Sequence, residues 1–520
     1  MTARRRWGGT KRKLSALLAA VLLLTGLTGC WQMEEPEEEL PMQPMEEEEE
    51  ARPEKTAVLP EQLSLPYSPG RTLDPITCAD GMQQVVASLI YEGLFRLNRQ
   101  MEPEPCLCGS YSRDEDARRY VFELREGVVF SDGSPVTAKD VRASLDRARQ
   151  SQRYQSRLSG IASVSVSKGN VVITLSSPNT ALPALLDVPV VKSGTQNASA
   201  PVGTGPYLYE EAGSCLVANQ SWWRGANQAV DRIMLVEAAD QDTLLYRFSS
   251  HDVQVITADL TGASPVSITG RVDCLDADTT VLQYLGCNTA NGPLANGAVR
   301  RALWRGIHRE YLVNAFLSGH GRPAQFPVSP ASPLYPASLE TEYSLEAFTQ
   351  ALTASGYTPE TPLILLVNEE NSFKKAIADY LAESFTTVGL AIEVRSLPWL
   401  EYTAALAAGN FDLYYGEVRL SADWRLTSLL GTGGSLNYGR WTNPQTDQLI
   451  AALGASEDRT AAMQALCAHL LTEAPVLPLC FKSTSVLSQA GVLEGLTPTA
   501  AEPFYNLESC TVHLRGESES

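Results

Sequence analysis

The stretch Phe130–Val141 (FSDGSPVTAKDV) contains a strand end, a tight turn and the start of a helix. Within it, Ser131–Pro135 combines a glycine that allows positive φ with a proline that fixes its own φ, which is typical of a turn. Thr137 is followed three residues later by Asp140, the spacing of a capping box, so a helix is predicted to begin after Thr137. A capped helix after a turn is common in globular proteins and by itself indicates no function.

The segments on either side of this turn complete a small α+β pattern. Tyr120–Leu124 (YVFEL) is predicted to be a strand, and apolar residues at helical spacing follow from Val141 onward. Further along, Ala162–Ser167 and Val171–Leu175 alternate apolar and polar residues around Lys168–Asn170. This alternation predicts a β-hairpin.

The region Pro362–Gly416 alternates strand and helix patterns. It predicts a strand, a helix, a strand, a helix and a strand, in that order, at Leu363–Val367, Lys374–Val388, Leu390–Leu397, Trp399–Ala408 and Phe411–Tyr415. Gly389 and Gly409 stand where helix C-caps belong. This order and spacing predict parallel strands joined by right-handed crossovers.

Ligands bind beyond the carboxyl ends of the strands in such a sheet. The segment that leaves the third predicted strand is Glu417–Trp424 (EVRLSADW). Glu417, Arg419 and Asp423 are therefore candidate binding residues. A surface loop with ordinary charges is the simpler interpretation of the same segment, and on this ground alone both stay open.

The first thirty residues have the pattern of a signal peptide. Six basic residues precede the short apolar run Leu14–Leu24, which ends in Leu27-Thr28-Gly29-Cys30. This ending resembles the lipobox of bacterial lipoproteins. The resemblance implies that residues 1–29 are removed and that Cys30 is lipidated and anchors the protein to a membrane. An ordinary signal peptide or an uncleaved anchor is the alternative.

The chain is acidic, with 41 basic and 60 acidic residues among 520 and a net charge of −19. Removal of the six basic residues near the start would leave 35 basic residues and a net charge of −25. Ten glutamates lie within Glu34–Glu50 among three prolines, so residues 30–56 are predicted to be a disordered, extended tether. This charge argues against a nucleic-acid partner.

The cysteines and histidines show no regular spacing. Nine cysteines remain besides Cys30, and Cys106-x-Cys108 is their one close pair, without a histidine or a second pair at zinc spacing. We expect mostly buried, apolar cysteines, one disulfide at most, and neither a metal site nor a cofactor. The chain has no Gly-x-Ser-x-Gly, His-Glu-x-x-His or phosphate-loop motif, so we expect no catalytic residues and no enzyme.

A series of short strings follows in order along residues 57–515. They are Leu73–Pro75 (LDP), Tyr91–Phe95 (YEGLF), Phe122–Val141 (FELREGVVFSDGSPVTAKDV), Gly203–Tyr207 (GTGPY), Tyr284–Gly286 (YLG) with Asn288, Val299–Val313 (VRRALWRGIHREYLV), Asn443–Asp447 (NPQTD) and Ala474–Leu479 (APVLPL). In number and order they resemble the bacterial extracellular solute-binding proteins of family 5, the peptide- and nickel-binding type that serves ABC importers.

The resemblance implies an α/β fold: a two-lobed, periplasmic-binding-protein-like clamshell of type II with an extra α+β domain inserted in one lobe. Lobe I would comprise residues 57–100, 200–280 and 484–515, the inserted domain residues 101–199, lobe II residues 281–483, and a tail residues 516–520. The chain would cross between the lobes near Thr279–Leu285 and Leu479–Ser485.

The resemblance also implies roles for residues of the candidate site. In peptide-binding members an Asp within an Ala-Asp-aromatic string pairs with the α-ammonium of the ligand, and Ala422-Asp423-Trp424 matches that string. Trp399 matches a tryptophan that opens a helix beside the ligand, with a role in the core as the alternative, and Arg419 is a candidate partner for a ligand carboxylate. We therefore expect five residues at the ligand: Asp423, Trp399, Arg419, Glu417 and Trp424.

The function expected from the resemblance is a monomeric, membrane-anchored receptor outside the cytoplasm. It would capture short peptides and deliver them to an ABC permease and its ATPase. Two departures concern the ligand: Leu420 stands where a tryptophan is common, and Cys78 stands near the place of a frequent acidic residue. Chelated nickel, an oligosaccharide or another small solute therefore stays open. A sensor lipoprotein or a hydrolase is a more distant alternative.

Overall fold

The computed structural model describes residues 59–225, 228–261, 266, 268, 270–358 and 361–515. The predicted signal peptide, Cys30, the acidic segment 30–56 and the tail 516–520 lie outside these residues. Within the described ranges, no helix is both long enough and apolar enough to span a bilayer.

A four-stranded sheet in the order β1-β10-β9-β8 stands at the start of the fold. Its strands are β1 (Leu63–Tyr67), β8 (Tyr207–Glu210), β9 (Cys215–Ala218) and β10 (Arg232–Glu237). The helix α1 (Gly81–Ala87) and the short strands β18 (Leu493–Glu494) and β19 (Thr511–Val512) belong to the same region. The helix α3 (Gln241–Ser249) follows β10 in the chain. One apolar core joins β1, α1, β18 and β19, with Leu63, Val86, Leu493 and Val512 among its buried residues. The two ends of the described chain therefore pack together.

A second, antiparallel sheet in the order β4-β5-β7-β6 has a core of its own. Its strands are β4 (Cys108–Arg113), β5 (Arg119–Leu124), β6 (Ile161–Ser167) and β7 (Asn170–Leu175). The helix α2 (Ala138–Ala148) contacts β6 and β7 and buries Val141, Leu145 and Ala148. Short elements beside this sheet are β2 (Phe95–Leu97), β3 (Pro103–Pro105) and the 3₁₀ turn η1 (Leu182–Leu185).

Two local predictions in this region are confirmed. The helix α2 begins after Thr137, where a capping box forms and the Asp140 carboxylate accepts a hydrogen bond from the Thr137 backbone N–H at 3.1 Å. The hairpin between β6 and β7 turns at Lys168 and Gly169, with φ of 51° and 86°. Two consecutive positive φ values are typical of the tight type I′ turn that matches strand twist.

The third sheet has seven strands in the order β11-β17-β12-β16-β14-β15, with β13 also paired to β17. They are β11 (Val255–Ala258), β12 (Val272–Cys287), β13 (Gly321–Pro323), β14 (Leu363–Asn368), β15 (Ile392–Leu397), β16 (Leu413–Arg419) and β17 (Val476–Gln489). The helices of this region are α4 (Gly297–Arg305), α5 (Arg309–Phe316), α6 (Leu345–Ala354), α7 (Ser372–Thr386), α8 (Trp399–Ala408), α9 (Thr427–Leu430), α10 (Pro444–Ala455) and α11 (Arg459–Glu473). The remaining 3₁₀ turns are η2 (Pro293–Ala295), η3 (Ala337–Leu339) and η4 (Leu507–Ser509).

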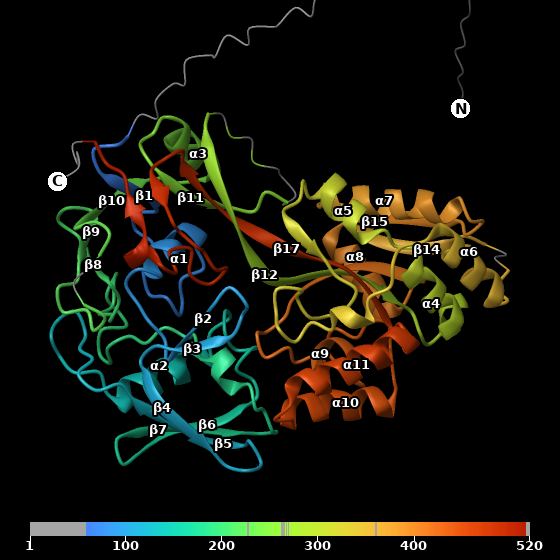
Figure 1. The fold of residues 1–520 in the computed structure, drawn as a ribbon, viewed down its shortest axis with the longest axis horizontal. Helices are drawn as coiled ribbons and strands as arrows, with labels where there is room; N and C mark the ends of the chain where they lie inside the picture. The colour runs from blue at the N-terminus through green and yellow to red at the C-terminus, as the bar shows by residue number, and fades with distance from the viewer. Residues whose placement is uncertain are drawn as a thin grey trace, which may run out of the picture. The chain divides into compact units, whose positions relative to one another are not determined.

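The long strands β12 and β17 run between the two halves of this architecture (Figure 1). Their antiparallel pairing has a register shift between Asp278 and Leu282. At the shift the Thr279 hydroxyl donates a hydrogen bond to the Lys482 carbonyl at 2.6 Å. On one side of the shift β17 pairs with β11, and on the other β12 pairs with β16. The predicted crossing segments lie in the middle of these two strands.

The strand–helix alternation predicted for Pro362–Gly416 is confirmed, with two differences. The helix α7 ends at Thr386 with Thr387 as its C-cap, so the prediction of Gly389 as that C-cap is wrong. β14 lies between β15 and β16 and is parallel to both. β16 is longer than predicted and runs to Arg419, so Glu417 and Arg419 lie on the strand rather than in the segment that leaves it. The reason is β12, which pairs with β16 as far as Val281 opposite Arg419 and so extends the ladder.

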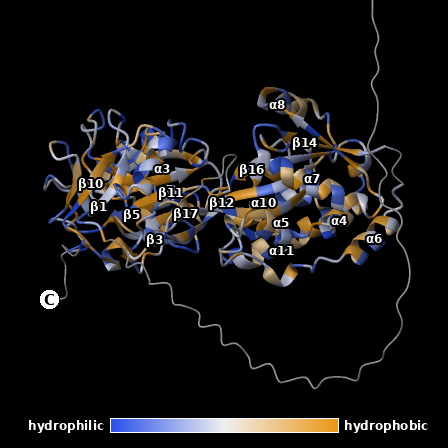
Figure 2. Ribbon diagram, turned by 90° about the horizontal axis from the view of Figure 1, so that it is seen from above, coloured by the Kyte–Doolittle hydropathy of each residue, from blue (hydrophilic) through white to orange (hydrophobic). Residues whose placement is uncertain are grey.

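Buried apolar side chains form separate cores around the three large sheets. Figure 2 shows hydrophobic residues along strands such as β11 and β14.

The nine described cysteines are all free thiols, and eight of them are buried. The exception is Cys274, which is exposed. The prediction of mostly buried, apolar cysteines is therefore confirmed.

Candidate ligand-binding site

The carboxyl ends of β14, β15 and β16 meet at one edge of the seven-stranded sheet. They end at Asn368, Leu397 and Arg419. Because the three strands are parallel, these ends face the same way. β12 runs antiparallel to β16, so Val281 and Gln283 lie opposite Arg419 and Glu417, close to the register shift. This edge is the candidate ligand-binding site.

Glu417 contacts two side chains from neighbouring elements. Its Oε2 atom accepts a hydrogen bond from Gln283 Nε2 at 2.9 Å and lies 3.2 Å from Lys374 Nζ on α7. Burial raises the pKa of Glu417, but Lys374, Gln283 and Lys482 lower it by more, so the carboxylate stays ionised. Gln283 Oε1 is buried and has no hydrogen-bond partner in the described part of the chain. The whole Gln283 side chain is buried, so an incoming donor reaches this acceptor only if neighbouring side chains move.

Lys482 extends this cluster across the register shift. Its Nζ atom lies 2.7 Å from Oδ2 of Asp259, which follows β11. The same ammonium lies 5.9 Å from the centroid of the Phe373 ring on α7. The Lys482 side chain is 9% exposed and that of Asp259 is 50% exposed. The pair therefore joins a buried cation on one side of the shift to an accessible anion on the other.

Arg419 is exposed, and its guanidinium has no hydrogen-bond or ion-pair partner among the residues that the structure describes. Burial nevertheless lowers the pKa of Arg419; Glu417 and Asp259 raise it, and Arg153 lowers it further. Arg153 lies between α2 and β6. Charged groups from three regions of the fold therefore act on Arg419: β16, the segment after β11, and the segment between α2 and β6.

Cations predominate immediately around Glu417 and Arg419, in an acidic protein. Among Glu417, Arg419 and the charged groups that act on their pKa values, four side chains are cationic and two are anionic: Lys374, Lys482, Arg419 and Arg153, and Glu417 and Asp259. The whole chain carries −19. Such a local excess attracts an anionic group, and a planar guanidinium without a partner suits a carboxylate.

Asp423 lies four residues beyond β16, and its carboxylate is buried, with 2% of the side chain exposed. Asn179, which precedes η1, donates to Asp423 Oδ2 from Nδ2 at 2.9 Å. The Ser421 hydroxyl donates to Oδ1, and Arg425 Nε lies 3.6 Å from Oδ2. Asp423 therefore connects the α/β unit to the β4–β7 sheet region. Its pairing with a ligand ammonium stays a prediction.

The two tryptophans predicted at the site have different surroundings. Trp424 is 1% exposed and meets the Phe481 ring edge-on, at 6.0 Å between ring centroids. Trp399 begins α8, is 55% exposed, and stacks on Tyr402 at 5.8 Å. Trp424 therefore supports the Asp423 loop from the core, and Trp399 is available to a ligand.

Sequence reasoning nominated Glu417 and Arg419 and missed their partners. Gln283, Lys482 and Asp259 belong to other strands and loops, and no local spacing relates them to Glu417. A second convergence was also missed, that of Cys274, Asp276 and His320. No metal site is expected from the sequence, because the histidines are scattered. His320 and Asp276 are 44 positions apart, so their contact leaves no pattern of local spacing.

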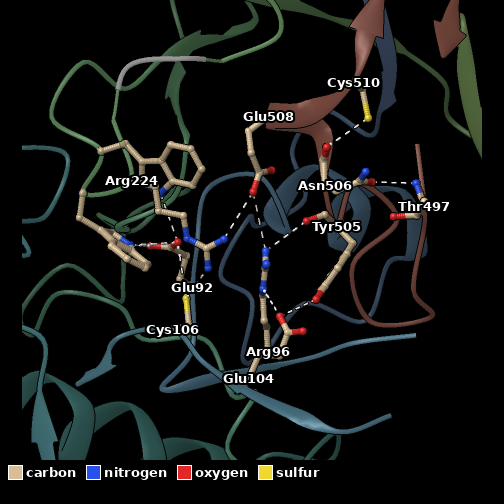
Figure 3. Close-up of polar contacts among 12 residues, drawn as sticks. Glu92, Arg96, Glu104, Cys106, Arg224, Thr497, Tyr505, Asn506, Glu508 and Cys510 are labelled. Carbon is tan, nitrogen blue, oxygen red and sulfur yellow. Dashed lines mark hydrogen bonds and ion pairs between the residues drawn. The ribbon is translucent and has the colours of Figure 1, made fainter. Parts of the chain in front are cut away.

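A separate polar cluster surrounds Glu92 (Figure 3). Its carboxylate accepts hydrogen bonds from the indole N–H groups of Trp222 at 3.2 Å and Trp223 at 2.9 Å. Arg224 and Glu502 line an adjoining cavity of about 40 Å³. A cavity of this size holds a few water molecules and no peptide, so the cluster is not the ligand site.

Glu502 makes this cluster sensitive to pH. Burial raises its pKa to about 7 from an ordinary value of 4.5; Arg96 lowers it and Glu92 raises it. The folded state therefore favours the protonated, neutral form of Glu502. The contribution of Glu502 to the free energy of unfolding is largest below pH 4.5 and is lost as the pH rises through 7, where the buried carboxyl ionises. Glu502→Gln cannot ionise, so we expect it to be more stable than the wild type by about 2 kcal/mol near pH 8 and nearly equal to it near pH 5.

Urea unfolding at the two pH values measures this difference. Glu61→Gln is the control, because the Glu61 side chain is 82% exposed. We expect the control to follow the wild type at both pH values. A Glu502→Gln effect of the same size at both would contradict the assignment.

Comparisons with known proteins identify relatives of this chain. The profile of the bacterial extracellular solute-binding proteins, family 5 Middle, matches residues 102–435. The glutathione-binding protein GsiB of Escherichia coli (strain K12) is 24% identical over 441 residues, which cover 78% of this chain and 86% of that protein. GsiB of Shigella flexneri is similar to the same extent, with 24% identity over 441 residues.

Solved structures share the fold. The unliganded open form of MppA, a periplasmic murein tripeptide binding protein, aligns with a TM-score of 0.72 at 22% identity, over 88% of this chain and 98% of that one. A nickel ABC transporter structure from Bacillus halodurans aligns at 0.73 and 20% identity, over 88% and 100% of the two chains. NikA from Brucella suis with Fe(III)-EDTA aligns at 0.68 and 20% identity, over 87% and 99%. The predicted two-lobed, type II fold class is confirmed.

Proposed function

Because this chain belongs to the bacterial extracellular solute-binding proteins of family 5, we propose that it captures short peptides between its two lobes and delivers them to the permease of an ABC importer. Proteins of this family are substrate-binding components of ABC importers and not enzymes. The proposal concerns the ligand class and the residues that hold it.

The observation that carries the proposal is the excess of cations immediately around Glu417 and Arg419. Arg419 offers two parallel N–H donors to a ligand carboxylate and has no competing partner in the described chain. The unpartnered acceptor Gln283 Oε1 would serve a main-chain N–H of an extended peptide once neighbouring side chains move to expose it. Asp423 is the proposed partner of the ligand ammonium, and the exposed Trp399 is a further proposed ligand contact.

We expect the two lobes to close over the ligand, because the site lies beside the register shift between β12 and β17. Arg419 lies on one side of the shift, and Asp259 follows β11 on the other. A ligand that contacts both sides binds the closed state better than the open one, and this difference in affinity drives closure.

The names of the relatives support a peptide and suggest one alternative. GsiB is named for glutathione and MppA for a murein tripeptide, whereas the NikA structure contains Fe(III)-EDTA. A chelated metal is the second candidate, because a chelator rich in carboxylates would meet the same cations.

The proposal includes a location and partners. Cys30 would carry the lipid anchor, and residues 30–56 would tether the binding domain to the membrane as a monomer. The importer's permease and ATPase subunits would receive the ligand. Detection of diacylglyceryl-modified Cys30 by mass spectrometry of protein from its native host tests the anchor. An N-terminal peptide that begins elsewhere would exclude it.

The ligand carboxylate gives the proposal a direct test. Isothermal titration compares a tripeptide with a free C-terminal carboxylate and its C-terminal amide, after mass spectrometry of co-purifying molecules has selected the tripeptide. We expect the wild type to bind the acid about 10- to 100-fold more tightly than the amide. We expect Arg419→Gln to lose this preference, because it lacks the charge-assisted pair.

Arg271→Gln is the matched control, since Arg271 lies before β12 and outside the site. We expect it to keep the preference for the acid. Equal binding of acid and amide by the wild type would exclude Arg419 as the carboxylate partner. The absence of any co-purifying or binding peptide would exclude the peptide function.

A further inference from the structure

Three potential metal ligands of different chemistry converge beside the register shift in β12. Cys274 and Asp276 are two residues apart on β12 and therefore project from the same face of the strand. His320 reaches them from the residue before β13. No other group of three such ligand atoms converges within the described ranges.

The distances fit a single ion. His320 Nδ1 lies 3.0 Å from Asp276 Oδ2, and Cys274 Sγ lies 3.9 Å from Asp276 Oδ1. All three ligand atoms lie within 4.8 Å of one another. Ligands of a tetrahedral zinc ion, at bond lengths of 2.0–2.3 Å, stand about 3.3–3.6 Å apart. Small rotations of the exposed Cys274 side chain are enough to reach this geometry.

We propose that Cys274, Asp276 and His320 form a binding site for a divalent transition-metal ion of the zinc class. A thiolate, an imidazole and a carboxylate are a ligand set for such an ion and not for Ca²⁺ or Mg²⁺, which prefer oxygen ligands. The Cys274 thiol releases its proton to solvent when it binds the ion. Three protein ligands leave the fourth position to water.

The surroundings orient the ligands. The Ser485 hydroxyl on β17 donates a hydrogen bond to Asp276 Oδ1 at 2.6 Å, opposite Asp276 in the ladder. The His320 backbone is held on both sides, since its N–H donates to the Leu317 carbonyl at 2.8 Å and its carbonyl accepts from the Ser483 N–H at 3.2 Å. Such outer contacts fix ligand orientation at metal sites.

A cysteine protease-like triad is the other reading of these residue types, and the geometry argues against it. A triad requires the nucleophile on the imidazole nitrogen opposite the carboxylate. Here the thiol approaches the carboxylate itself, within hydrogen-bond distance for sulfur, on the side of His320 Nδ1. Convergence of all three atoms on one point favours an ion.

The site links two parts of the fold that lie on either side of the register shift. Cys274 and Asp276 lie on the part of β12 that pairs with β17 beside β11, whereas His320 precedes β13, which pairs with β17 at Lys482. The neighbouring pair of Arg322 and Asp278 joins the same two segments. A bound ion therefore adds a second cross-link at the shift and is expected to raise the melting temperature.

Titration of the purified chain with Co²⁺ tests the site, because a cobalt–thiolate bond gives a charge-transfer band in the near ultraviolet. We expect one equivalent of this band in the wild type and its loss when Zn²⁺ is added. Cys274→Ser should abolish the band, and His320→Ala should weaken Co²⁺ binding at least about tenfold. Zn²⁺ should raise the melting temperature of the wild type and not that of Cys274→Ser.

His513→Ala is the matched control, because His513 Nε2 lies 3.2 Å from Glu494 in an exposed pair without a thiol. We expect its cobalt band to equal that of the wild type. The absence of a band in the wild type, or its persistence in Cys274→Ser, would overturn the proposal.

This site is independent of the proposed peptide function, and one variant distinguishes the two. Cys274→Ser/His320→Ala should bind the tripeptide as the wild type does. Metal binding that survives in this variant would mean that other residues hold the ion, and would overturn the site at Cys274.

Discussion

Replacing Gly286 with alanine is expected to lower the free energy of unfolding by about 3 kcal/mol or more. Gly286 lies on β12 opposite Tyr414 of β16. A Cβ atom at residue 286 would stand 2.0 Å from Tyr414 Cε1, whereas real Cβ atoms essentially never approach within 3.0 Å of another heavy atom. The tyrosine ring would have to move.

The ring has no free space into which it can move. Tyr414 is 2% exposed, and its ring meets those of Phe411 at 5.2 Å and Tyr438 at 6.0 Å. The arrangement is reciprocal, because a Cβ atom at Gly416 would stand 2.3 Å from Cζ of Tyr284. Two glycines therefore let two buried tyrosines lie across neighbouring strands.

Urea unfolding followed by tryptophan fluorescence measures the effect. Gly81→Ala is the matched control, because its Cβ atom would meet nothing within 4 Å at the start of α1. We expect it to be as stable as the wild type. Gly286→Ala/Tyr414→Leu should be less destabilised than the sum of the single variants, since the leucine vacates the ring position. Additive effects would contradict the ring clash.

Replacing Asp423 with alanine is expected to lower the free energy of unfolding by about 2–3 kcal/mol. The substitution leaves the Asn179 amide and the Arg425 guanidinium without the buried carboxylate. The Arg425 side chain is 30% exposed, so water compensates part of the loss. Thermal unfolding checks this result, and a wild-type melting temperature would contradict it.

Two further substitutions separate this structural role from the proposed contact with a ligand ammonium. Asp423→Asn keeps the size of the side chain and removes its charge, whereas Asn179→Ala removes the neighbour and keeps the charge. We expect Asp423→Asn to bind a tripeptide with a free amino group about tenfold less tightly or worse, and Asn179→Ala to bind it nearly as the wild type does. Wild-type affinity in Asp423→Asn would remove Asp423 from the binding site.

Local patterns predicted the elements whose causes are local. The capping box at Thr137 and the hairpin turn at Lys168 depend on residues within four positions, and both form as predicted. The helix Trp399–Ala408 begins and ends as predicted, because Gly409 supplies the left-handed C-cap at φ 76°. The parallel unit was predicted because its apolar runs and intervening helices follow one another in the chain.

Differences arose where a distant segment acts. β16 continues to Arg419 because β12, more than 100 residues earlier, pairs with it. Two tryptophans of the candidate site have opposite exposure, 1% for Trp424 and 55% for Trp399, because Phe481 covers the first. Nothing in the segment around either tryptophan distinguishes the two environments.

The sequence alone was sufficient for the family resemblance, the α/β class and the nomination of Glu417 and Arg419, because each rests on short strings or on the shared edge of parallel strands. The partners of the site residues could be identified only from the tertiary structure. Lys482 meets Asp259 across 223 positions, and Asn179 meets Asp423 across 244. His320 meets Asp276 in the same way. The spacing of residues along the sequence reflects only local backbone structure, whereas these contacts depend on how distant segments are arranged in the fold.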